Sequence, residues 1–137
     1  MPIIKPKLVW ANIKHARKTG WKPDYCLNFV HTMFNVPSDG TGTAIDEIVK
    51  LTNAGRLRTD APGPFGVLCW KPVTGHTSPY GHVAIRCFRA KNKGYCWTTD
   101  YGGTGTVRKV KIADITAARG GGYVGWSKWV DGAQVRP

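Results

Sequence analysis

The pattern of apolar residues changes once along the chain, from helical spacing to alternation. In the first half, apolar residues recur every three or four positions, which is the spacing of one helix face. This pattern predicts helices over about residues 8–18, 24–35 and 44–53, the second ending before Pro37 and the third at Gly55. The apolar face of the second helix consists of Cys26, Phe29, Val30, Met33 and Phe34.

From residue 66 onward, apolar and polar residues alternate in short segments that are separated by glycine-rich turns, a pattern typical of strands. A hairpin turn is expected at residues 91–94. A short helical turn is expected at 113–119, and the segment 120–130 supplies a last strand. Helices followed by an antiparallel sheet indicate the α+β class. The four main strands are predicted at residues 66–71, 81–89, 94–100 and 106–112.

Length and composition indicate one globular domain. The 137 residues suffice for a hydrophobic core without metal or disulfide support, and 42% of them are hydrophobic. Seventeen glycines and nine prolines favour a loop-rich α+β or β-rich protein over a helical bundle. No apolar run approaches the ~20 residues that cross a membrane, and the N-terminus lacks the features of a signal peptide. We therefore expect synthesis in a cytoplasm.

The chain carries a formal net charge of +12, from 20 basic and 8 acidic residues. This charge predicts a polyanionic partner without identifying it, and both nucleic acid and an anionic cell wall fit. A surface that is charged for solubility alone is the remaining alternative. The basic residues are scattered, and no block of five or six like charges marks a nucleic-acid tail.

A cysteine and a histidine occupy positions that suit thiol chemistry. Cys26 lies at the start of a predicted helix, where the positive end of the helix dipole stabilises a thiolate. His82 follows Gly81 at the start of a predicted strand. Asp100 closes the next strand, and a hairpin would bring it back to orient the imidazole. These residues predict a nucleophile, a base and an orienting group, although a buried structural thiol and an ordinary strand histidine are the alternatives.

The other three cysteines, Cys69, Cys87 and Cys96, lie in apolar, strand-like segments. Such cysteines usually behave as small hydrophobic core residues, and a disulfide or metal role is the alternative. His76 could join a zinc site, but no cluster with ligand spacing accompanies it. We therefore predict no metal and no cofactor.

Three segments together resemble the CHAP class of cysteine, histidine-dependent amidohydrolases/peptidases, with the NlpC-type peptidases as more distant relatives. The segments are Gly-Val-Leu-Cys-Trp at 66–70, Gly-His-Val-Ala-Ile-Arg at 81–86 and Thr-Asp-Tyr at 99–101. The resemblance extends over residues 21–101. It implies a papain-like fold with N-terminal helices on a small antiparallel sheet, and a Cys26–His82–Asp100 mechanism.

Size and charge make the chain similar to the peptidase domain of a bacteriophage endolysin. This resemblance implies a monomeric peptidoglycan hydrolase that cleaves an amide bond of the stem peptide or cross-bridge. Such a protein is made in the host cytoplasm and reaches the wall by a holin-type route. Neither nucleic acid nor membrane is then expected as a partner.

A thiol hydrolase also needs donors that stabilise the negatively charged oxyanion, and residues that bind the substrate. The backbone N–H of Cys26 is the expected oxyanion donor, with Asp24 and Tyr25 as neighbours. Aromatic residues near the predicted strand ends would line a groove for a glycopeptide, or belong to the core. The predicted substrate-binding residues are Tyr25, Trp70, Tyr80 and Tyr101, and Trp97 lies near the same strand ends.

Two other kinds of function remain open on the sequence alone. A basic nucleic-acid-binding module would explain the charge, with exposed aromatic residues stacking on bases. It would leave the Gly-His-Val-Ala-Ile segment unexplained. A papain-like protease or transferase that acts on proteins, such as a secreted toxin, would use the same catalytic residues.

Overall fold

The computed structural model describes residues 3–22, 25–37, 42–75, 80–99, 101, 105–130 and 132–135. The fold is α+β, as predicted. Within the described residues, no helix combines the length and apolar character needed to cross a bilayer. The helices of this part of the chain are α1 (Pro6–Thr19), α2 (Cys26–Met33), α3 (Ala44–Asn53) and α4 (Ile112–Ala118).

The main sheet has five strands in the order β5-β4-β3-β2-β6, and every neighbouring pair is antiparallel. Each of the four main predicted strands is present and is shorter than expected by two to four residues. The connection from β3 to β4 contains a single 3-10 turn (Ala90–Asn92), which overlaps the predicted hairpin turn. The strands are β2 (Val67–Trp70), β3 (His82–Arg86), β4 (Tyr95–Thr99), β5 (Val107–Lys111) and β6 (Tyr123–Ser127).

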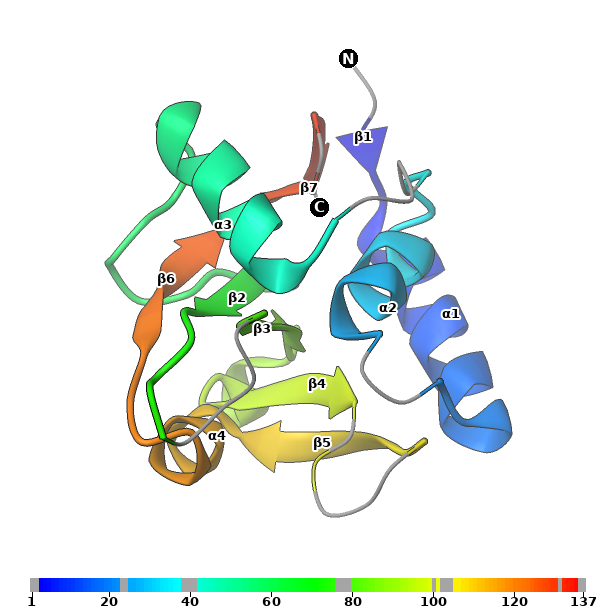
Figure 1. Cartoon of the computed structure of the whole chain (residues 1–137). Coiled ribbons are helices and arrows are strands. Elements are labelled where there is room, and N and C mark those ends of the chain that lie inside the picture. The colour runs from blue at the N-terminus through cyan, green and yellow to red at the C-terminus, as the bar shows by residue number, and fades with distance from the viewer. Residues whose placement is uncertain are drawn as a thin grey trace.

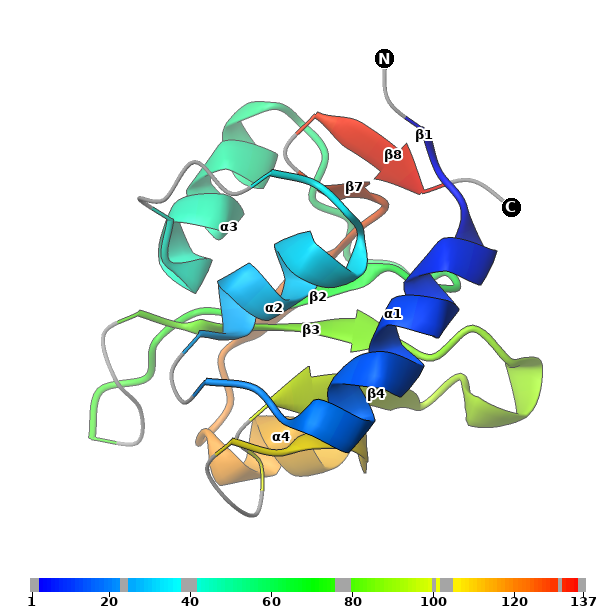
Figure 2. The ribbon, with the colours of Figure 1, turned by 90° about the vertical axis from the view of Figure 1, so that its right-hand side faces the viewer.

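Helices cover both faces of this sheet (Figures 1 and 2). Val83 and Ile85 point to the face that α1, α2 and α3 cover, and they belong to the larger hydrophobic core. Ala84, between them, points to the opposite face and packs with Ile115 of α4 in a second core. Alternation along β3 therefore places His82 on the same face as Ala84, towards α4.

Helix α2 begins at Cys26, two residues later than the sequence pattern predicts. Tyr25 precedes the helix, and its backbone (φ −112°, ψ 43°) lies outside the helical region. The helix ends at Met33, before Asn35, whose positive φ of 57° stops further helical bonding. Residue 24 lies outside the described residues. The shorter helix leaves Cys26 in the first helical position.

Helix α3 lies at its predicted position and has a complete capping box. The side chain of Thr43 accepts a hydrogen bond from the N–H of Asp46, and the Asp46 carboxylate accepts one from the N–H of Thr43. The Ile45 N–H donates to the carbonyl oxygen of Tyr80 at 2.8 Å. This bond attaches the segment before β3 to the start of α3.

A second, small sheet was not predicted. It has three strands in the order β1-β8-β7, and β1 lies parallel to β8. The pairing brings together residues more than 130 positions apart in the sequence. Its strands are β1 (Ile3–Ile4), β7 (Trp129–Val130) and β8 (Ala133–Val135).

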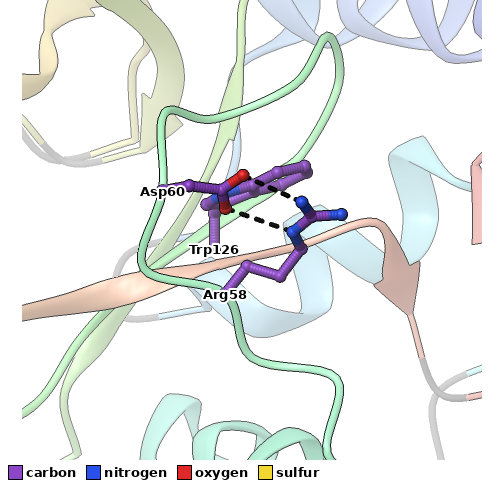
Figure 3. A network of polar contacts seen from close by, with 3 residues as sticks. All are labelled: Arg58, Asp60 and Trp126. Carbon is purple, nitrogen blue, oxygen red and sulfur yellow. Dashed lines mark hydrogen bonds and ion pairs between the residues drawn. The ribbon is translucent and has the colours of Figure 1, made fainter.

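The long connection between α3 and β2 is held to β6 by a polar network (Figure 3). The Arg58 guanidinium donates from Nε and Nη2 to the two carboxylate oxygens of Asp60, at 3.1 and 2.8 Å. The indole N–H of Trp126 donates to Asp60 at 3.1 Å. Backbone bonds join Arg58 and Trp126 in both directions. The hydrogen bond from Arg58 is the main cause that lowers the pKa of Asp60.

Candidate active site

A pocket of about 720 Å³ opens where α2, β3, β4 and α4 meet. Cys26 reaches it from the start of α2, and His82 from the start of β3. Thr98 reaches it from β4, and Arg119 follows directly after α4. Side chains from elements on both faces of the sheet therefore meet at the ends of the strands.

Cys26 is partly exposed and occupies the first position of α2. The Phe29 N–H donates to the Tyr25 carbonyl at 2.9 Å, which is the first helical bond of this segment. In a helix that begins at Cys26, the first backbone N–H groups point out of the helix start. N–H groups at a helix start favour negative charge, so this position suits both a thiolate and an oxyanion.

His82 is held from two sides. Its Nε2 lies 2.7 Å from the hydroxyl oxygen of Thr98 on β4. The Trp70 indole lies beside the imidazole, with ring centroids 5.7 Å apart. Trp70 is itself fixed because its N–H donates to the Thr116 hydroxyl at 2.9 Å. The imidazole orientation is thus set by β4 and α4 together.

The hydrogen bonds of Thr98 indicate which imidazole nitrogen carries the lone pair. The Thr98 hydroxyl donates to the carbonyl oxygen of Thr99 at 3.4 Å. With its single proton used there, Thr98 accepts from Nε2–H of His82. We assign the neutral tautomer on this network, and it leaves the lone pair on Nδ1.

The surroundings keep His82 uncharged. Burial, followed by the positive charge of Arg119, lowers the pKa of His82 from 6.5 to about 3. At neutral pH the imidazole is therefore neutral and able to accept a proton. A general base needs this state before the reaction begins.

The lowered pKa of His82 makes stability depend on pH in a defined window. Between about pH 6.5 and pH 3 the unfolded chain binds a proton at this position and the folded chain does not. The contribution of His82 to the free energy of unfolding is complete above pH 6.5. Acidification through this window removes it at up to about 1.4 kcal/mol per pH unit. Denaturant unfolding across this range should show a smaller slope for His82→Gln than for the native chain.

His15, exposed on α1, gives the matched control. The variant His15→Gln should keep the native pH dependence. Equal slopes for the native chain and His82→Gln would show that His82 does not remain neutral in the folded protein.

The variant Thr98→Val tests the role of the Thr98 hydroxyl, because valine has the same shape as threonine without the hydroxyl. In Thr98→Val, Nε2–H loses its acceptor, and the imidazole loses its preferred tautomer. For the thiol chemistry that the sequence predicts, we expect kcat to fall about 10- to 100-fold with little change in KM. Thr98→Ser keeps the oxygen and should retain most of the activity. A Thr98→Val enzyme with native kcat would show that Thr98 does not position the base.

Three of the four predicted substrate-binding aromatic residues line the pocket. Tyr25 and Tyr80 are exposed at its rim, by 53% and 58%, and Tyr101 is partly buried. Trp70 is fully buried, which argues against contact with substrate. Its indole packs beside His82 instead. Trp97, which also lies near the predicted strand ends, is buried against α1, where Arg17 covers its ring at 4.9 Å.

Thr98 and Arg119, two polar pocket residues that act on His82, were not predicted from the sequence. The orienting residue proposed from the sequence, Asp100, lies outside the described residues, so its role stays a prediction. In the strand predicted at 94–100, alternation of the sequence puts positions 98 and 100 in one set, and this signal could have identified Thr98. No local pattern marks Arg119, because its place depends on how α4 packs on the sheet.

The remaining cysteines are core residues, as expected. Cys69, Cys87 and Cys96 are buried, and none of the four cysteines is in a disulfide. Burial raises the pKa of all three thiols, that of Cys87 to about 11. His76 lies outside the described residues, which contain no cluster of three or more potential metal ligands. Cys26 is the one cysteine that lines the pocket.

Comparison with models of known protein families finds no match, and no curated protein matches the chain. The class that the fold and the site define is therefore a small α+β protein with a cysteine and a histidine in one pocket.

Proposed function

We propose that this protein is a papain-like cysteine peptidase or amidase of the CHAP type that hydrolyses an amide bond of peptidoglycan. The main support is that Cys26 and His82 come from different elements and line the same pocket. The contact between His82 and Thr98 provides the third, orienting group. A nucleophile, a base and an orienting group are the parts that thiol hydrolases share.

In the proposed mechanism, Nδ1 of His82 takes the proton of the Cys26 thiol. The sulfur then attacks the amide carbonyl carbon, and N–H groups at the start of α2 stabilise the oxyanion. The imidazolium gives its proton to the leaving amine as the C–N bond breaks and a thioester remains. Water, deprotonated by His82, then hydrolyses the thioester and restores the thiol.

Two surface properties favour a cell-wall substrate. The net charge of +12 attracts an anionic polymer. Tyr25 and Tyr80 expose flat rings at the pocket rim, where they suit contact with sugar or peptide. A peptide amide within an anionic wall satisfies both properties and the thiol chemistry.

The function is tested by incubating the chain with purified cell walls and analysing the soluble products. Amide hydrolysis releases one new amine and one new carboxylate per bond, and mass spectrometry identifies the bond that is cut. We expect new amines without new reducing sugar ends. A chain that releases no fragments from any wall, or that releases reducing ends alone, would rule out the proposal. Salt-sensitive binding to DNA or RNA without wall hydrolysis would instead support the nucleic-acid alternative.

A further inference from the structure

We propose that Arg119 forms the binding site for a carboxylate group of the substrate, placed next to the amide bond that Cys26 attacks. The inference rests on the proposed hydrolase function and specifies its substrate as an acidic peptide. Arg119 would then be a specificity residue.

The first observation is that two nitrogens of the Arg119 guanidinium have no hydrogen-bond partner among the described residues. Its Nε and Nη2 are buried without a hydrogen-bond acceptor, and no described carboxylate lies within ion-pairing distance. Burial is the main cause that lowers the pKa of Arg119. A buried cationic donor without an acceptor is costly, so an acceptor from a ligand would be strongly favoured.

The second observation comes from Arg58 in the same molecule. Arg58 holds the Asp60 carboxylate through the same two nitrogens, Nε and Nη2 (Figure 3). This edge of a guanidinium matches the two oxygens of a carboxylate. In Arg119 the equivalent edge is unpaired. The side chain is partly exposed and lines the pocket, so turning its guanidinium would present this edge to a bound carboxylate.

The third observation is the location of Arg119 beside the reacting groups. Its charge acts on His82, and a negative charge on Cys26 acts on Arg119. All three residues line one pocket. A carboxylate held by Arg119 would therefore lie close to the attacked carbonyl group. It would also compensate a positive charge that the described residues leave unpaired.

The inference can be tested without any cell wall, by alkylating Cys26. Iodoacetate and iodoacetamide react alike: the thiolate forms an S–C bond and iodide leaves. Only iodoacetate carries a carboxylate. We expect the ratio of the two rates, iodoacetate over iodoacetamide, to fall about tenfold in Arg119→Gln. Arg119→Lys should give an intermediate ratio, because lysine keeps the charge without the two-pronged geometry. Mass spectrometry confirms that Cys26 is the modified residue.

Arg108, exposed on β5, provides the control for net charge. Arg108→Gln loses the same charge and should keep the native ratio. An unchanged ratio in Arg119→Gln would overturn the inference. So would an equal fall in both rates, because Arg119 would then act on the thiolate alone.

A second measurement separates this inference from the proposed function. Native walls are compared with walls whose carboxyl groups have been converted to amides. The native chain should prefer the carboxylate form, and Arg119→Gln should lose the preference mainly through KM. An Arg119-dependent alkylation ratio without wall hydrolysis would keep the carboxylate site and reject the peptidoglycan function. Wall hydrolysis with the same preference in both chains would keep the function and reject the site.

Discussion

Replacing Cys26 by alanine is expected to abolish wall hydrolysis, with kcat lowered on the order of 10⁴- to 10⁶-fold. The sulfur is the only atom in the proposed mechanism that bonds to the substrate, so no neighbouring group can replace it. Amine release from purified walls measures the loss. Because Cys26 is partly exposed at the start of α2, the change should leave the free energy of unfolding nearly unaltered.

A buried cysteine gives the control for this variant. Cys87→Ala removes a thiol from the core and should lower stability slightly while hydrolysis per folded molecule stays native. Circular dichroism checks that both variants are folded. Wall hydrolysis that persists in folded Cys26→Ala would show that the activity does not use this thiol.

Replacing Gly81 by alanine is expected to affect both stability and activity. Gly81 has a φ of +75°, and an added Cβ would lie 2.7 Å from the carbonyl oxygen of Trp70. Strain and overlap together should lower the free energy of unfolding by about 2–5 kcal/mol. His82 is the next residue, so the relieving movement displaces the base. A displacement near 1 Å costs about 100-fold in rate. Denaturant unfolding and amine release measure the two effects.

The variant Gly55→Ala is the control that separates backbone strain at positive φ from steric overlap of the added Cβ. Gly55 has a similar φ of +68°, but nothing lies within 4 Å of its added Cβ. We expect a cost of about 1 kcal/mol and native activity. If Gly81→Ala is as mild as Gly55→Ala, the close approach to Trp70 does not set the position of His82.

Regular, local patterns predicted the main elements of the fold. Alternation in Gly-His-Val-Ala-Ile predicted the strand β3 that carries His82. Helical spacing identified α3 to the residue. These signals suffice because each element repeats its pattern over several residues.

What escaped prediction depends on contacts between distant residues. Strands β1 and β8 are only two and three residues long, so neither carries a periodic signal. Arg119 reaches the pocket only because α4 packs against the sheet face that carries His82. The burial of Trp70 follows from the same packing, and the sequence could not distinguish a groove residue from a core residue there.

The parallel pairing of β1 with β8 also has a mechanical consequence. Ile3 pairs with Gln134, and Ile4 with Val135. Pulling the two ends of the chain apart would draw the two strands in opposite directions along their length. The pairs would then be sheared together instead of separating one after another. A force that pulls the two ends apart would therefore act on this small sheet before it acts on the five-stranded sheet that carries His82.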